Sequence, residues 1–188
     1  VAERIDEHRR APQAAAVVDF WVEAGPQRWF EKDEAFDREF RERFLAWHQA
    51  AMRGELADWQ GSVQGALALV LLLDQFPRNA FRGTPAMYED DPLALQVAVA
   101  ALAAGYDRAV APELKIFFYL PFMHAENLAD QERSLALCQA EAKGHLGYAE
   151  EHRDIIARFG RFPHRNAILG RESTAEERRF LDAGGFSG

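Results

Sequence analysis

The sequence is poor in cysteine and in lysine, and each scarcity narrows the kind of protein it describes. Cys138 is the only cysteine among 188 residues, so no disulfide forms within the chain, which suits a reducing cytosol. Of the 22 basic residues only Lys32, Lys115 and Lys143 are lysines, and the other 19 are arginines. An excess of arginine is expected from a GC-rich genome, but arginine also offers forked donors to carboxylates and phosphates.

Long apolar runs are absent as well. No uncharged apolar stretch reaches the roughly 20 residues that a membrane-spanning helix needs. No basic stretch followed by an apolar segment and a small-residue cleavage site stands at the start, so we expect no signal peptide. With 48% apolar and 28% charged residues, the composition is typical of a folded, soluble protein. We therefore predict a cytoplasmic protein that does not contact membranes.

Basic charge is in the minority overall but is locally concentrated. The formal net charge is −8, so we expect no nucleic-acid partner. Residues 158–171 nevertheless contain four arginines and His164 without an acid, and residues 75–88 contain Arg78 and Arg82 without an acid. These two islands are candidate anion-binding surfaces. The alternative is that their arginines cap helix ends or pair with acids of neighbouring helices.

No segment alternates apolar and polar residues over the length of a strand, whereas helical spacing recurs along the whole chain. The sequence therefore predicts an all-α protein. We expect one domain over residues 1–188, with residues 1–12 forming a loose N-terminal extension. The predicted helices cover approximately residues 13–24, 33–54, 62–76, 91–105, 112–120, 130–159 and 174–184.

Four details of these helices can be compared with a structure. Pro77 is expected to end the third helix and to begin a loop over residues 78–90. Asp91 is expected to cap the next helix, because Pro92 follows it at the first helical position. Residues 130–159 read as one long amphipathic helix, either straight or bent near Gly144 or Gly147. The pair Thr174 and Glu177 has the spacing of a capping box.

Three blocks of residues resemble the signature blocks of one bacterial family. They are residues 72–79 (Leu-Leu-Asp-Gln-Phe-Pro-Arg-Asn), 121–126 (Pro-Phe-Met-His-Ala-Glu) and 159–166 (Phe-Gly-Arg-Phe-Pro-His-Arg-Asn). Asp19-Phe20-Trp21 and Trp29-Phe30 also resemble its opening, and the match runs from about Pro12 to the C-terminus. The sequence is similar to the domain-of-unknown-function family numbered nine hundred and twenty-four. This resemblance implies a tetratricopeptide-like, right-handed array of about seven to nine helices, and it implies no activity.

The same blocks contain the candidate catalytic residues. His124 or His164 has the chemistry of a general acid or base, and Glu126 or Asp74 that of the carboxylate that orients it. Such a pair would serve a hydrolase or a lyase. A metal-assisted form would use His124, Glu126 and His164. Because their spacing is not diagnostic and no His-Glu-x-x-His motif occurs, we predict no metal and no other cofactor.

The blocks also suggest a binding pocket. In this hypothesis Arg78 and Arg165 hold a small anionic ligand, or an acidic segment of a peptide or protein, and two asparagines orient it. A third interpretation is a polar network that serves structure alone. The remaining candidate ligand-binding residues are Gln75, Asn79, Asn166 and, as an apolar wall, Trp21 and Trp29.

Overall fold

The computed structural model describes residues 2–187, with side chains described from Pro12 onward. Within this part of the chain there is no strand, and the predicted all-α class is confirmed. The helices are α1 (Ala2–Ala24), α2 (Pro26–Trp29), α3 (Glu34–Met52), α4 (Val63–Val70), α5 (Phe76–Ala80), α6 (Asp91–Ala103), α7 (Lys115–His124), α8 (Leu128–Glu141), α9 (Leu146–Phe159) and α10 (Ala175–Asp182). A π-turn, η2 (Leu71–Gln75), joins α4 to α5. The 3-10 turns are η1 (Ala57–Gly61), η3 (Pro85–Met87), η4 (Tyr106–Arg108), η5 (Pro112–Leu114), η6 (Lys143–His145) and η7 (Pro163–Arg165).

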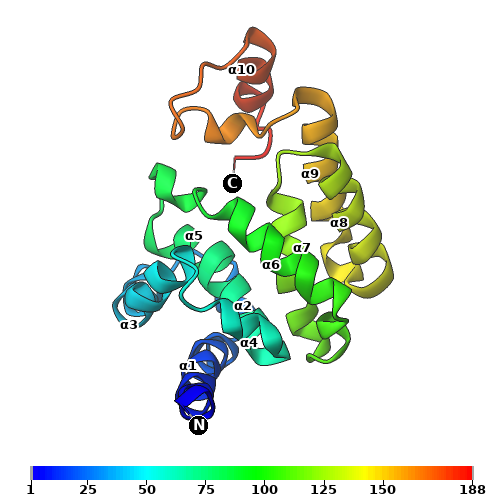
Figure 1. Ribbon diagram of the computed structural model, residues 1–188. Helices are drawn as coiled ribbons and strands as arrows, with labels where there is room; N and C mark the ends of the chain where they lie inside the picture. Colours follow the sequence, from blue (N-terminus) through cyan, green and yellow to red (C-terminus); the bar gives the residue numbers. More distant parts are fainter. Residues whose placement is uncertain (1, 188) are drawn as a thin grey trace.

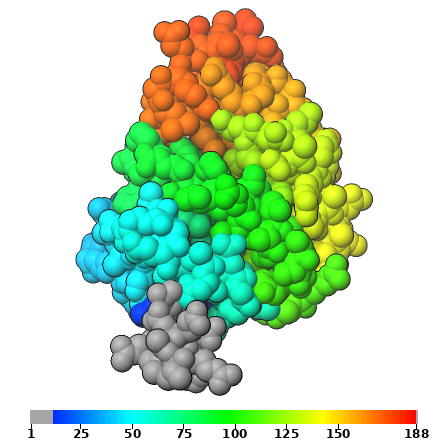
Figure 2. All heavy atoms as spheres, in the orientation of Figure 1, coloured from blue at the N-terminus to red at the C-terminus, as the bar shows by residue number. Residues whose placement is uncertain are grey.

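The helices are arranged in approximately the order in which they occur in the chain. Figure 1 shows α1 at one end of the molecule and α10 at the other, with α6 and α7 between them. In Figure 2 the sequence colours follow one another across the visible surface in the same order. Helix α7 packs against α4, α6, α8 and α9, so its residues are buried on all sides, as its apolar composition requires.

Aromatic side chains dominate the part of the core near the N-terminus. Helix α3 has an apolar stripe along one face, since Phe36, Phe40 and Phe44 are all buried. The ring of Phe20 stacks on that of Phe36, with 5.2 Å between centroids. Asp33 caps α3 by accepting hydrogen bonds from the N–H groups of two residues in its first turn. The local signals that predicted this helix therefore also determine its start and its buried face.

Several predicted helix boundaries are wrong. The helix predicted over residues 112–120 continues through Pro121 to His124. The helix predicted to end at Pro77 continues to Ala80, after the π-turn η2. Proline has no N–H, and its ring collides with the carbonyl four residues earlier. A widened turn places that carbonyl elsewhere, and the N–H of Phe76 bonds to the carbonyl of Leu71 instead. The proline changes the helix without stopping it.

The predicted long helix over residues 130–159 is in fact the two packed helices α8 and α9. The break falls at Ala142, with φ −141° and ψ 54°, and at the 3-10 turn Lys143–His145. Amphipathic spacing continues across the break because both helices bury one face against α7. Periodicity therefore indicated the buried faces correctly. The turn that separates the two helices contains Gly144, one of the two glycines near which the sequence allows a bend.

No helix of the described chain has both the length and the apolar composition needed to cross a membrane. The tetratricopeptide-like handedness and the loose extension over residues 1–12 stay predictions, and residue 1 lies outside the described residues.

Candidate functional site

Asp74 and His124 form the centre of the candidate site. Asp74 lies in the π-turn η2 and is completely buried, while His124 is the last residue of α7 and has a side chain that is 14% exposed. Oδ1 of Asp74 is 2.7 Å from Nδ1 of His124. Nε2 of Gln75 donates to the other carboxylate oxygen at 2.7 Å. The sequence blocks predicted these three residues, and the structure brings them into direct contact.

The hydrogen bond between the two residues determines the form of the imidazole. Burial favours a protonated Asp74, but the positive charge of Arg78 and the hydrogen bonds that the carboxylate accepts from His124 and Gln75 lower its pKa to about 2. An ionised carboxylate accepts hydrogen bonds only, so Nδ1 of His124 carries the proton. Burial and the charge of Arg78 lower the pKa of His124. At neutral pH the ring is therefore neutral, with an unprotonated Nε2.

Three hydrogen bonds from two side chains hold the end of α7 in place. The backbone carbonyl of His124 accepts from Nη2 of Arg165 at 3.0 Å. Nε2 of the buried Gln131 donates to the carbonyls of Met123 and Ala125, at 2.6 and 2.8 Å. Because the last carbonyls of a helix have no partner within it, such donors determine its geometry. Sequence reasoning missed Gln131, a glutamine on an otherwise ordinary helix face.

Asp91 joins the two arginines that the sequence singled out. Arg78 binds both carboxylate oxygens of Asp91, at 2.8 and 3.1 Å, and Nη1 of Arg165 binds one of them at 3.1 Å. The prediction that Asp91 caps α6 is wrong, since the helix begins at Asp91 and Asp90 holds the cap position. The acid-free stretch ends at Tyr88, directly before three consecutive acids. This change from an acid-free stretch to three acids is the sequence feature that could have identified Asp91 as a partner of the arginines.

A second buried acid–histidine pair lies beside this cluster. Oδ2 of Asp90 is 3.5 Å from Nε2 of His48, and both side chains are 3% exposed. Burial, Glu89 and Asp91 raise the pKa of Asp90 to about 6. Nδ1 of His48 donates to the carbonyl of Leu72 in the π-turn, at 3.0 Å. The sequence did not identify either residue, and this pair now helps to hold η2 in position.

Glu126 and His164 are not hydrogen-bonded to the pair formed by Asp74 and His124, which we call the dyad. Glu126 accepts two bonds from Arg171, at 2.6 and 2.9 Å, and one from the N–H of Phe162 at 2.7 Å. The ring of His164 lies between those of Phe162 and Phe186, and its buried Nδ1 has no hydrogen-bond partner. Burial, followed by the charge of Arg165, lowers the pKa of His164 to about 3. Its surroundings are those of a packed, neutral ring.

The two predicted asparagines and the two predicted tryptophans each contact residues in their own part of the fold. Oδ1 of Asn79 accepts from Arg82 at 3.2 Å, and Oδ1 of Asn166 accepts from Arg171 at 3.0 Å. The rings of Trp21 and Trp29 lie in the aromatic core, 5.5 and 5.0 Å from that of Phe117 between centroids. Nε1 of Trp29 donates to the carbonyl of Trp21 at 2.6 Å.

No three His, Cys, Asp or Glu side chains in the described chain lie close enough together to hold a metal ion. The metal-assisted form of the site therefore receives no support from this arrangement.

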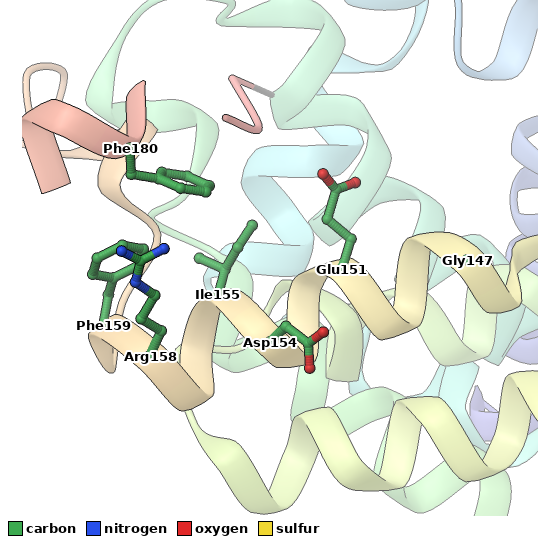
Figure 3. A pocket seen from close by; sticks show the side chains of 7 residues that line it. All are labelled: Gly147, Glu151, Asp154, Ile155, Arg158, Phe159 and Phe180. Atoms are coloured by element: carbon green, nitrogen blue, oxygen red, sulfur yellow. The ribbon is translucent and has the colours of Figure 1, made fainter. Parts of the chain in front are cut away.

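A shallow groove lies elsewhere, between α9 and α10 (Figure 3). Its volume is about 430 Å³, and Phe159 and Phe180 supply its aromatic side. The guanidinium of Arg158 lies 4.7 Å from the centroid of Phe159 and also binds Glu176. The groove contains none of the predicted site residues. The candidate site is accordingly defined by its chemistry and not by the size of a hollow.

Comparison with known proteins shows the family of this chain. A family model described as a bacterial protein of unknown function (DUF924) matches residues 17–185. The chain belongs to the DUF924 family. A solved structure of a protein of unknown function from Agrobacterium tumefaciens is 55% identical, with a TM-score of 0.91, and the match covers 93% of this chain and 99% of that one. Among curated proteins nothing matches.

Proposed function

We propose that this DUF924 protein is an enzyme that uses His124 as a general acid or base, oriented by Asp74. The observation that carries the proposal is the 2.7 Å contact between Nδ1 of His124 and the buried carboxylate of Asp74. A buried, ionised carboxylate fixes the tautomer of the ring and stabilises the imidazolium that forms when Nε2 takes a proton. No described group is hydrogen-bonded to Nε2.

The surroundings of the dyad favour the hydrolase or lyase chemistry that His124 itself can perform. No described serine, threonine or cysteine is hydrogen-bonded to His124. Cys138 and Ser134 are completely buried, and burial raises the pKa of the Cys138 thiol to about 11. Ser62 and Thr174 cap helices. We therefore expect Nε2 to take its proton from a water molecule or directly from the substrate, without a serine or cysteine nucleophile.

A hydrolysis screen tests this proposal. Aryl acetates and aryl phosphates should be turned over by the wild type, and His124→Gln and Asp74→Asn should each lower kcat/KM about 10²-fold or more. His164→Gln is the matched control, because it removes an imidazole from the same region, and we expect its kcat/KM to stay within about twofold of the wild type. A wild-type rate no higher than that of His124→Gln on every substrate contradicts the proposal.

Binding without catalysis is a second candidate. The observation in its favour is that Arg78 and Arg165, from distant segments, meet at the single carboxylate of Asp91. A small anionic ligand or an acidic peptide segment would take up the position of a carboxylate at this cluster. In this case His124→Gln should leave ligand affinity unchanged, and the hydrolysis screen should show no turnover that depends on His124.

A further inference from the structure

The guanidinium of Arg165 lies against two aromatic rings. Its central carbon is 4.4 Å from the centroid of Tyr88 and 4.6 Å from that of Phe162. A guanidinium that lies over a ring uses its edge for hydrogen bonds. Along this edge Nη1 binds Asp91 and Nη2 binds the carbonyl of His124, whereas Nε is buried and has no partner. The side chain is 7% exposed.

Other arginines of this protein use the same edge to bind a carboxylate with two bonds. Nε and Nη2 of Arg161 bind the two oxygens of Glu177 at 2.6 and 2.8 Å. Nε and Nη2 of Arg82 bind Asp37 at 2.5 and 3.2 Å. This fork is the geometry in which arginine recognises carboxylate and phosphate groups. At the same edge of Arg165, Nε has no hydrogen-bond partner.

The nearby carboxylates are already engaged. Asp91 gives both of its oxygens to Arg78 and shares only one of them with Arg165. Glu126 gives both oxygens to Arg171. A buried donor without an acceptor destabilises the folded protein. Of the charged groups in this cluster, Arg165 therefore has most to gain from an acceptor supplied by another molecule.

We infer that Arg165 binds an oxyanion of the substrate, a phosphate or a carboxylate, beside the imidazole of His124. This inference rests on the proposed function, since it names the class of substrate on which the dyad acts. The oxyanion occupies the Nε edge of Arg165, and a small shift of the side chains that cover Nε accompanies its binding. Arg165 also donates to the backbone carbonyl of His124, so an oxyanion bound at Arg165 is close to that residue in the fold.

Charge balance gives the inference a measurable consequence. With a neutral His124, the positive charges of Arg78 and Arg165 are cancelled by the negative charges of Asp74 and Asp91. An added oxyanion leaves the cluster negative, and a negative charge near an imidazole favours its protonated form. Binding should therefore raise the pKa of His124.

The experiment is an NMR titration of the histidine ring protons of the full chain, with inorganic phosphate or acetate as the probe. Chloride at equal ionic strength is the reference. We expect either phosphate or acetate, or both, to raise the pKa of His124 by about one unit, with a dependence on concentration that saturates. The anion that acts at the lower concentration identifies the substrate group.

Two variants locate the effect at Arg165. Arg165→Lys keeps the charge but loses the fork, and it should weaken phosphate binding at least tenfold. Tyr88→Leu keeps the arginine and removes one of its two rings, so it should weaken binding severalfold even if Arg165→Lys does not fold. The matched control is Arg82→Lys, which alters an arginine that already has Asp37 as its partner and should leave the titration unchanged.

A pKa of His124 that responds to phosphate and acetate no more than to chloride overturns the inference, and so does an equal response in both Arg165→Lys and Tyr88→Leu. The proposed function is judged separately. Hydrolysis that depends on His124 without an anion response removes only the oxyanion site. An anion response through Arg165 without hydrolysis removes the catalytic role.

Discussion

At the scale of single residues, the chemistry of the site depends on which nitrogen of His124 carries the proton. Asp74 decides this, because its buried carboxylate accepts from Nδ1 and so leaves Nε2 as the basic atom. Gln75 occupies the second oxygen of that carboxylate. Each oxygen of the carboxylate thus has a donor, and the ring cannot reverse its tautomer without breaking a buried bond.

Glu177 provides a prediction at this scale that concerns stability. Its buried carboxylate accepts from Arg161, from Asn166 and from the N–H of Thr174, and hydrogen bonds from Arg161, which outweigh burial, help to lower its pKa to about 2. Glu177→Gln removes this charge and should lower the free energy of unfolding by about 2 kcal/mol. Denaturant unfolding measures the change.

The neighbouring Glu176 is the control for that measurement. Its side chain is 53% exposed, and its one ion pair is with Arg158. Exposed pairs contribute little, so Glu176→Gln should change the free energy of unfolding by less than about 0.5 kcal/mol. Equal losses in the two variants would show that the buried network does not stabilise the C-terminal segment.

At the scale of elements, the close approach of η1 to α4 determines how α4 begins. Ser62 caps α4 by accepting from the N–H of Gly65. A Cβ atom at Gly65 would collide with the backbone carbonyl oxygen of Trp59. Because that oxygen belongs to the backbone of η1, the collision cannot be relieved by a change of rotamer. A glycine is required here by space and not by its backbone angles.

Gly65→Ala should therefore lower the free energy of unfolding by about 2 kcal/mol or more, even though alanine is the better helix former. Gly147→Ala is the control, since Gly147 is also helical and a Cβ there meets nothing within 4 Å. It should be neutral or stabilise the protein by up to about 1 kcal/mol. Thermal unfolding of both variants tests this, and a Gly65→Ala variant as stable as Gly147→Ala is the contrary result.

The elements also show what the sequence could predict. Local signals were sufficient for the cap at Asp33, for the capping box of Thr174 and Glu177, which is confirmed, and for the all-α class. The π-turn was not predictable from propensity, because it arises from the conflict between Pro77 and a helix that its neighbours hold in place. For the site, the sequence singled out Asp74, His124 and the arginines by residue type. It offered the pairing of His124 with Asp74 only as one of several alternatives, and it gave no indication that Arg165 binds Asp91, which lies 74 residues away.

At the scale of the whole molecule, two similar corners of the chain meet at one place. Arg78 follows the π-turn and Arg165 lies in η7, and both bind Asp91. In each corner the asparagine that follows accepts a bond from a later arginine of the same segment. Residues 76–83 (Phe-Pro-Arg-Asn-Ala-Phe-Arg-Gly) are also similar in sequence to residues 162–171 (Phe-Pro-His-Arg-Asn-Ala-Ile-Leu-Gly-Arg). This similarity has a structural counterpart in the hydrogen bonds that hold each segment.

The whole molecule should also be sensitive to mild acid. Burial is the main reason why the pKa of His152 falls to about 4 and that of His164 to about 3, from an ordinary value of 6.5. The unfolded chain takes up these protons below pH 6.5 while the folded chain does not, so stability is complete above pH 6.5 and falls as the pH drops toward 4. Each histidine contributes up to about 1.4 kcal/mol per pH unit.

Unfolding by urea at several pH values measures that slope. His152→Gln and His164→Gln should each flatten it between pH 6.5 and 4, whatever their stability at neutral pH. Below this range a second loss is expected, because Asp74 and Glu177, with pKa values of about 2, must be protonated. A wild-type stability that is constant from pH 6.5 to 4.5 would contradict the prediction.

The long separation between the partners of the site has a consequence for the order of folding. Helices and their turns form from neighbouring residues, whereas Asp74 meets His124 across 50 residues and Asp91 meets Arg165 across 74. Contacts between distant segments carry the largest loop-closure cost and form late. During synthesis, Arg78 and Asp91 therefore lack their third partner, Arg165, until η7 has been synthesised and has packed against them. Substitutions at Arg165 should accordingly speed unfolding more than they slow folding, and the candidate site is the last part of the molecule to be completed.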